Sequence, residues 1–456
     1  MSASTLSAAS APDRETTAGV TSLLAERISA LRFTDLPAPV VTVARQSLLD
    51  WLGVCLAARD EPLVDIISAV ARDEGGAPQA ALIGRAERVS LLQAALVNGA
   101  MGHALDYDDV NAMGHPTAPV APVVLALGEK LGASGADVLT AFVAGYEIET
   151  RVGLFMGPSH YDRGWHSTAT CGAFGAAAAA GRLLGLSPAL LAHAFGLAGT
   201  QAAGLKCMFG TMSKPLHAGL AAQAGLRAAL LAARGFTSNP AVLEAAQGFG
   251  DTQSSAPRVS RAFDDPPGGF HLPANLFKHH AACYLTHSTI EAIGALRIAH
   301  DLTPQAVSAI RVEVAPTHLK VCDIAEPRTG LECKFSIRTM AALALAGEDT
   351  ADERLYSDEI AARPDLAHLR ALTSVVPTSS GTLAHVELRL ADGRTLRASR
   401  DVGVPETDLA EQQARLEAKF VRLARGVVEP DRAVRACANL VRARDLTELI
   451  SAVTYP

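Results

Sequence analysis

The sequence has few aromatic residues, few charges and no closely paired cysteines. Aromatic side chains make up 5% of the 456 residues and charged side chains 19%, whereas hydrophobic residues reach 49%. Because Ala, Leu and Val carry most of the apolar share, the composition favours helices packed through short side chains. The seven cysteines include no C-x-x-C pair. This argues against a zinc ribbon or a cysteine-ligated iron–sulfur cluster and fits free thiols in a reducing cytoplasm.

Strong charge of one sign and long apolar runs are also missing. With a net charge of −7 and no basic run, the chain has no electrostatic footprint for nucleic acid or an anionic membrane. The apolar stretches at 173–180 and 228–233 are shorter than the roughly 18 residues that a membrane span needs. Residues 1–19 lack the basic and apolar regions of a signal peptide and predict a disordered tail. We therefore expect a soluble, cytoplasmic protein without nucleic-acid or membrane partners.

Three common catalytic motifs are absent. The chain has no Walker A loop, no G-x-G-x-x-G after a strand and no G-x-S-x-G elbow. Nucleotide-phosphate binding, dinucleotide binding and serine hydrolysis are therefore not indicated by any motif.

The first half of the chain shows the spacing of amphipathic helices. Apolar residues recur at helical intervals, Gly and Pro clusters separate the segments, and strand signals are nearly absent. Predicted helices cover residues 39–59, 90–106, 119–131 and 136–153. A helical pattern returns over residues 406–453, which indicates that the chain re-enters the first domain.

The segment between these helical regions shows a different pattern. Residues 310–314 and 385–390 alternate apolar and polar side chains with period two, as strands do. An Asp392-Gly393 turn joins the second run to residues 395–397, and this is a strong hairpin signal. We therefore expect a small α+β domain after the turn cluster at 266–269.

Titratable residues gather in one short segment that holds three carboxylates and two imidazoles. His103 and Asp106 are three residues apart and would share a face at a helix end, and the proline after His115 restricts that residue to an extended conformation. A carboxylate beside an imidazole can orient it and stabilise its protonated form, which suits acid–base chemistry. In the alternative interpretation His103 packs, Asp106 caps a turn, and Asp108 and Asp109 are solvated.

Small residues surround two further candidates. Ser167 or Thr168 would cap a helix with almost no side-chain bulk, so that its amino end could face an anion beside His166. Close helix packing explains the small residues equally well. Lys214 precedes a proline ahead of an apolar helix and could bind a carboxylate or stabilise an enediolate, or else cap a neighbouring helix. Lys206 is a second candidate of this kind.

Basic and titratable residues gather again over Lys278–His287, near the predicted domain junction, and clefts between domains are favoured ligand sites. Its three histidines and Cys283 could in principle hold zinc. Adjacent histidines rarely converge on one ion, however, and no acidic ligand is near, so we expect no metal. Lys334 and Arg338 supply two cations at helical spacing, which is more typical of a structural pair than of a substrate clamp.

Taken together, these segments resemble the MmgE/PrpD family, which includes 2-methylcitrate dehydratase, cis-aconitate decarboxylase and iminodisuccinate epimerase. The resemblance implies a large all-α domain, a smaller α+β lid domain, a homodimer and a cofactor-free site between the domains. The family-like motifs occur in family order at Asn98-Gly99, His103 to Asp109, Gly114 to Pro116, Gly164 to His166, Gly210 to His217, Gly235 to Thr237, Lys278 to His287 and Lys334 to Ser336.

With this resemblance we expect a disordered tail at 1–19, a helical domain at 20–265 plus 405–456, and an α+β lid domain at 266–404. The motif positions imply the site residues. The expected catalytic residues are Asp106, His115, His166 and Lys214, and the expected substrate-binding residues are His103, Lys278, Cys283, His217 and Lys206.

The predicted function is that of a cofactor-independent lyase acting on a small di- or tricarboxylate, similar to 2-methylcitrate dehydratase. Family members create or quench a carbanion next to a carboxylate, which requires a base within about 3 Å of the carbon and cations beside the carboxylate. Lys214 and Lys278 are the expected cations. We expect His166 or Asp106 to take the proton, and His115 or another histidine to protonate the departing hydroxyl.

Two residues depart from the decarboxylase pattern. Val110 replaces a hydroxyl residue that decarboxylase and dehydratase members carry, and Cys283 replaces a histidine of the decarboxylase. Residues 157–170 look closest to the epimerase branch. An epimerase, a decarboxylase and a non-catalytic carboxylate-binding protein therefore remain alternatives.

Overall fold

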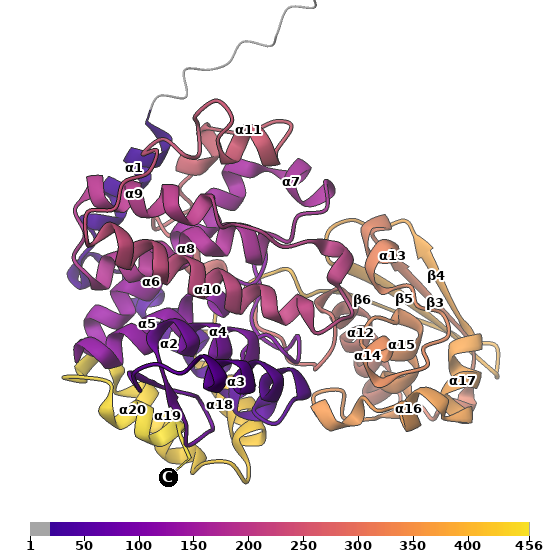
Figure 1. Ribbon diagram of the computed structural model, residues 1–456. Coiled ribbons are helices and arrows are strands. Elements are labelled where there is room, and N and C mark those ends of the chain that lie inside the picture. Colours follow the sequence, from indigo (N-terminus) through magenta and orange to yellow (C-terminus); the bar gives the residue numbers. More distant parts are fainter. Residues whose placement is uncertain (1–18, 456) are drawn as a thin grey trace, which may run out of the picture.

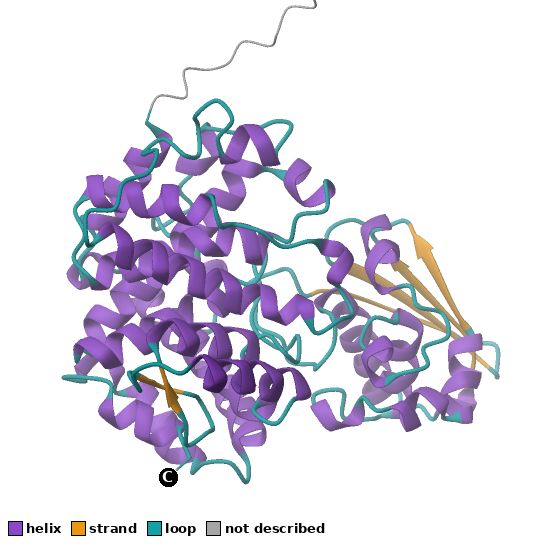
Figure 2. Ribbon diagram, viewed as in Figure 1, coloured by secondary structure: helices purple, strands orange, loops and turns teal. Residues whose placement is uncertain are grey.

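The computed structural model describes residues 19–455, and the predicted disordered tail falls outside these except for Gly19. Within them the fold is mainly α-helical, with small sheets, as the composition predicts (Figures 1 and 2). One cluster of buried hydrophobic residues draws on positions 20–281 and 416–453, and a second on positions 282–390. The exact domain boundaries that we expect remain a prediction.

The amino-terminal part is a stack of helices with one short two-stranded ribbon. The elements are α1 (Val20–Ser29), α2 (Ala38–Ala58), α3 (Pro62–Glu74), β1 (Ala80–Ala81), β2 (Arg88–Val89), α4 (Leu91–Met101), α5 (Thr117–Leu131), α6 (Gly135–Met156), α7 (Pro158–Asp162), α8 (Ser167–Leu183), α9 (Pro188–Gly199), α10 (Ser213–Ala232) and α11 (Phe249–Gln253). Helices α6 and α10 both pack against α8 in the centre of this stack.

The small residues of α8 allow its neighbours to approach closely. A Cβ atom added to Gly175 would lie 2.9 Å from the carbonyl oxygen of Gly145 on α6. On the other side, a Cβ atom at Gly225 of α10 would lie 2.5 Å from the carbonyl oxygen of Ala173. Both distances are shorter than a packed contact allows. The interpretation of this run as a close-packing surface is therefore confirmed.

The helix predicted over residues 90–106 is shorter in the structure, because α4 ends at Met101. At the helix end Gly102 keeps right-handed backbone angles and lies against the indole of Trp51, where a Cβ atom would fall 2.0 Å from Nε1. The chain then turns, and Asp106 takes a left-handed conformation with φ 52°. His103 and Asp106 therefore lie on a turn after the helix and not on one helical face.

The α+β part follows the helical stack and lies at its side (Figures 1 and 2). Its elements are α12 (His287–Ala299), β3 (Val307–Val314), α13 (Pro316–Cys322), α14 (Gly330–Cys333), α15 (Ile337–Ala346), α16 (Asp358–Ala362), α17 (Pro364–Ala371), β4 (Thr373–Pro377), β5 (Leu383–Leu390) and β6 (Thr395–Asp401). The sheet order is β4-β3-β5-β6, with β3 and β4 parallel and the other pairs antiparallel.

The hairpin predicted around Asp392-Gly393 is confirmed. Strands β5 and β6 pair in antiparallel register from Leu383 opposite Asp401 to Arg389 opposite Thr395. Gly393 has φ 90°, which a glycine adopts without strain. Alternate residues of β5 are buried, and α12 contacts both β5 and β6. The sheet therefore has one face covered by helix, as the period-two pattern predicts.

The last segment returns to the helical part. Helices α18 (Leu409–Ala424), α19 (Pro430–Ala438) and α20 (Thr447–Val453) follow the sheet, and α18 packs along α2. By length and composition, α2 is the one helix in residues 19–455 that could cross a membrane, but 78% of its most apolar window is buried inside the fold. It is a core helix of this stack.

Candidate active site

The loop after α4 forms the centre of the site. Tyr107 fixes this loop, since its hydroxyl donates to the carbonyl oxygens of His279 and Ala351 at 3.2 Å each. Asp106, immediately before it, holds the left-handed conformation that aspartate tolerates better than most residues. Such backbone strain occurs where the surrounding contacts enforce it, and often at functional sites.

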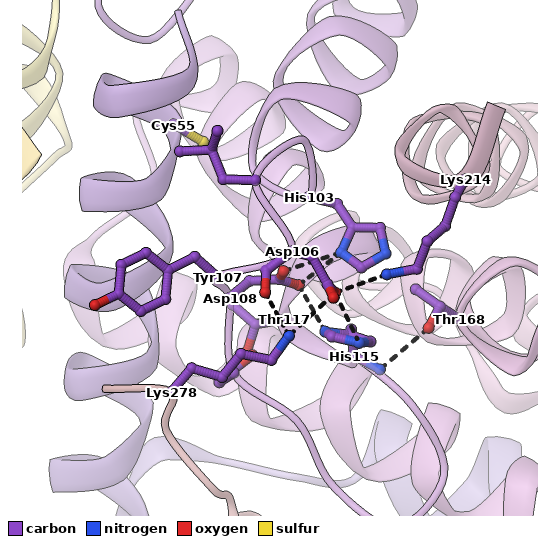
Figure 3. Close-up of polar contacts among 12 residues, drawn as sticks. Cys55, His103, Asp106, Tyr107, Asp108, His115, Thr117, Thr168, Lys214 and Lys278 are labelled. Atoms are coloured by element: carbon purple, nitrogen blue, oxygen red, sulfur yellow. Dashed lines mark hydrogen bonds and ion pairs between the residues drawn. The ribbon is translucent and has the colours of Figure 1, made fainter. Parts of the chain in front are cut away.

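Two ammonium groups converge on the Asp106 carboxylate (Figure 3). The Nζ atom of Lys214 lies 2.6 Å and that of Lys278 3.0 Å from Asp106 Oδ1, and Lys278 also donates to the Asp106 carbonyl oxygen at 2.5 Å. Lys214 lies in the first turn of α10 rather than ahead of it. Burial alone would raise the pKa of Asp106, but these ammonium groups outweigh burial and hold that pKa well below its ordinary value.

Asp108 holds two imidazoles in place (Figure 3). Its Oδ1 lies 2.9 Å from Nδ1 of His103, and its Oδ2 lies 3.0 Å from Nδ1 of His115. With Nδ1 occupied, His115 directs Nε2 toward Asp106 Oδ1 at 3.8 Å. His103 is fully buried beside it, and burial lowers the pKa of its imidazole to about 4, so that it is neutral at pH 7.

Asp109 faces away from these imidazoles and anchors the loop. It accepts hydrogen bonds from Thr117 Oγ1 at 2.6 Å and Asn275 Nδ2 at 2.5 Å. Burial raises the pKa of this carboxyl to about 7. Asp108 and Asp109 are both almost fully buried, so the interpretation of them as solvated residues is wrong.

His166 lies at the amino end of α8, which begins at Ser167. Neither Ser167 nor Thr168 caps the helix as expected, because Thr168 Oγ1 accepts the backbone N–H of His115 instead. The His166 ring stacks on that of His103 at a centroid distance of 6.0 Å, and its Nδ1 lies 3.1 Å from Nδ1 of His217. The structure thus brings His166 and His217 to the same cluster.

Two predicted residues stand apart. Lys206 donates to the carbonyl oxygen of Tyr161 at 3.0 Å and lies over its ring, and within residues 19–455 it contacts none of the other candidates. The backbone N–H of Cys283 donates to the carbonyl oxygen of Lys334 at 3.1 Å. Asp106 and Lys278 lie near enough to interact electrostatically with the Cys283 thiol, but neither is hydrogen-bonded to it in the described residues.

One group of side chains in the described part of the chain could hold a metal ion: His103, Asp106, Asp108 and His115, whose ligand atoms lie within 4.8 Å of one another. Within the described residues, the histidines and Cys283 of Lys278–His287 form no such group, and His280 Nδ1 is instead bonded to Thr350 Oγ1. A dication at the first group would compete with the two lysines for Asp106. The donor set therefore suits an ammonium–carboxylate cluster better than a metal centre.

Sequence reasoning missed a buried ion pair behind the loop. Lys419 of α18 lies 2.6 Å from Asp50 of α2, donates to the Tyr107 carbonyl oxygen at 2.8 Å, and lies over the Tyr107 ring. Neither residue belongs to a motif, and they are separated by most of the chain. An apolar helix that carries a single carboxylate at Asp50 was the one available signal.

Two domain models of one protein family match this chain along most of its length. The sequence model of the MmgE/PrpD N-terminal domain matches residues 22–262, and that of the MmgE/PrpD C-terminal domain matches residues 280–442. A cis-aconitate decarboxylase of Mus musculus is 27% identical over 84% of this chain and 82% of its own length.

Other relatives align over less of their length. A cis-aconitate decarboxylase of Aspergillus terreus is 30% identical over 62% of this chain and 61% of its own, and one of Homo sapiens is 30% identical over 61% and 60%. The chain thus spans about three fifths of these two relatives. With both family domains matched in order across the described fold, the chain belongs to the MmgE/PrpD family.

Proposed function

We propose that the chain is a lyase that acts on a small di- or tricarboxylate by side-chain acid–base chemistry. One observation carries the proposal: the single Asp106 carboxylate is shared by the ammonium groups of Lys214 and Lys278. Asp108 adds a second carboxylate, and Lys334, whose Nζ donates to the Leu105 carbonyl oxygen, adds a third ammonium group. Three positive charges then face two negative charges, which leaves an excess of one positive charge in a largely buried place. Such an excess favours binding of an anionic substrate, and it stabilises the negative charge that develops on the substrate during the reaction.

The proton to be removed is weakly acidic, so the geometry of base and cations decides the rate. Asp106 is a poor base, because its pKa is held well below the ordinary value and its lone pairs face two cations. Burial, together with the positive groups around it, lowers the pKa of His166 well below the ordinary value and keeps the imidazole neutral. No lysine is hydrogen-bonded to its nitrogens in the described residues, and the negative charge of a bound carboxylate would raise that pKa and strengthen the base. We therefore assign His166 as the base and Asp106 as the residue that positions the two lysines.

His115 is the proposed acid for the leaving group. Asp108 lies 3.0 Å from its Nδ1 and orients the ring, so that Nε2 points toward Asp106. An imidazole oriented by a carboxylate in this way can donate a proton from Nε2 to a departing hydroxyl.

Loss of water is our first proposal for the reaction, as in 2-methylcitrate dehydratase. Cys283 supports it, because it stands where the decarboxylase has histidine. Val110, which lies in a backbone bridge to Leu276, departs from the decarboxylase and dehydratase patterns alike and favours neither reaction. Loss of CO₂ is the second candidate, because the curated relatives are named cis-aconitate decarboxylases.

The test is incubation of the purified protein in D₂O with methylcitrate, citrate, cis-aconitate and iminodisuccinate, followed by NMR. Water loss, CO₂ release and exchange without elimination would indicate dehydratase, decarboxylase and epimerase, respectively. Lys214→Ala and His166→Ala should lose about 10²–10³-fold in kcat/KM, whereas Lys206→Ala, outside the cluster, serves as the matched control. Binding without exchange or turnover would reject the lyase in favour of a carboxylate-binding protein.

A further inference from the structure

Two imidazoles meet through like atoms beside the cluster. His166 and His217 face each other with their Nδ1 atoms 3.1 Å apart, at a ring-centroid distance of 5.3 Å. A hydrogen bond of this length requires one Nδ1 to carry hydrogen and the other to offer a lone pair. The tautomers of the two residues are therefore linked, and neither residue can choose its own independently.

The backbone holds both rings in this arrangement. The His166 N–H donates to the carbonyl oxygen of Gly204 at 3.0 Å, and Gly204 has φ 151°. A Cβ atom at Gly204 would lie 2.4 Å from the Ala169 Cβ and 3.4 Å from the His217 ring, so only glycine fits. His217 lies one turn after Lys214 on α10 and is 7% exposed. One segment thus fixes the positions of both imidazoles.

The charged groups around the pair keep both rings neutral. Burial lowers the pKa of His166 and of His217, and the Lys214 ammonium lowers both further. His103 and His115 face His166 from the loop after α4 and act in the same direction. No carboxylate in the described residues is hydrogen-bonded to either ring, so each imidazole has the other as its nitrogen partner.

We propose that His217 is a positioning residue that sets the tautomer of His166. This rests on the proposed function, in which His166 is the base. With the His217 Nδ1 as acceptor, His166 carries hydrogen on Nδ1 and presents a lone pair at Nε2, the form that a base needs.

The proton transfer balances without any further reactant. The bond between the substrate carbon and hydrogen breaks as Nε2 of His166 takes the proton, and the electron pair stays on the substrate. His166 is then an imidazolium whose Nδ1 hydrogen stays bonded to Nδ1 of His217. Loss of the Nε2 proton to solvent restores the starting tautomer of His166 for the next turnover.

Two substitutions separate hydrogen bonding from ring packing. His217→Phe keeps a ring but no acceptor, and kcat should fall roughly 10²-fold with KM changed less than about twofold. His217→Asn, whose Oδ1 can stand where Nδ1 was, should recover most of that loss. The pH profile of kcat/KM should shift in His217→Phe and not in His217→Asn. His193→Phe on α9, a partly buried histidine away from the cluster, is the matched control.

Nitrogen-15 NMR of histidine-labelled protein tests the pair without any substrate. We expect His166 protonated on Nδ1 in the wild type and mainly on Nε2 in His217→Phe. A wild-type His166 protonated on Nε2 would overturn the proposal even if the lyase activity is found. If NMR shows the predicted tautomers but the protein acts on none of the carboxylates, the proposed function is wrong. The hydrogen-bonded pairing of His166 with His217 would still hold. Unchanged kcat and pH profile in a folded His217→Phe would also overturn the proposal.

Discussion

The ion pair between Lys419 and Asp50 offers a sharp test of how the site loop is supported. Both side chains are buried, at 2% and 1% exposure, and their charged atoms lie 2.6 Å apart. Burial lowers the pKa of Lys419 and raises that of Asp50 in spite of the attraction between them. Each charge thus loses hydration energy on burial, and the pairing offsets this loss only in part. The pair as a unit contributes little stability, but removal of one partner leaves a buried charge alone.

We therefore expect Lys419→Met to lower the free energy of unfolding by about 3–5 kcal/mol, because Asp50 stays buried without its partner. The double variant Asp50→Asn/Lys419→Met removes both charges and should regain about 2 kcal/mol of that loss. Urea unfolding of the wild type, the two single variants and the double variant measures this coupling.

Activity should not recover with stability in the double variant. The Tyr107 carbonyl oxygen loses its 2.8 Å donor in both variants, and Tyr107 follows Asp106 directly. A displaced Asp106 would misplace the two lysines, and kcat/KM should fall roughly 10- to 100-fold. The reasoning is refuted if Lys419→Met is as stable as the wild type, or if the double variant regains full activity.

Three further predictions concern packing, pH and metal. Gly102→Ala should lower the free energy of unfolding by about 1–3 kcal/mol, since its Cβ would fall 2.0 Å from Trp51 Nε1; an unchanged melting temperature would contradict this. The pKa of His103 is about 4 in the folded state against roughly 6.5 unfolded, so its contribution to stability is complete above pH ~6.5 and is lost as the pH falls toward 4. Melting temperatures from pH 8 to 4 should show this decline, and His103→Gln should flatten it. EDTA should leave turnover unchanged, because two ammonium groups already occupy Asp106; loss of activity that zinc restores would contradict this.

Patterns in the sequence predicted the helices and turns that are determined by neighbouring residues. The helix expected at 39–59 forms as α2, and the Asp392-Gly393 turn joins β5 to β6, because periodicity and turn chemistry act over a few residues. The end of α4 was predicted five residues too late. The turn that follows α4 reaches Asp106, whose carbonyl oxygen accepts from Lys278 172 residues further along the chain, and no local pattern shows this contact.

The candidate site shows the same limit. Motifs directed attention to Asp106 and Lys214, which the structure joins, but no local pattern shows that Lys419 supports the loop from 312 residues away. The sequence also left open whether Asp108 was solvated, and its two bonds to His103 and His115 became visible only once the loop was folded.

The contacts of the Tyr107 hydroxyl bear on how the site loop folds. It joins the loop to carbonyl oxygens 172 and 244 residues further along the chain, and Lys419 joins the same residue from 312 residues away. Contacts of such long sequence separation carry a large entropic cost of loop closure. We therefore expect the loop to reach its working shape late in folding. Grafted onto another scaffold without these three distant segments, residues 103–115 would lose that shape.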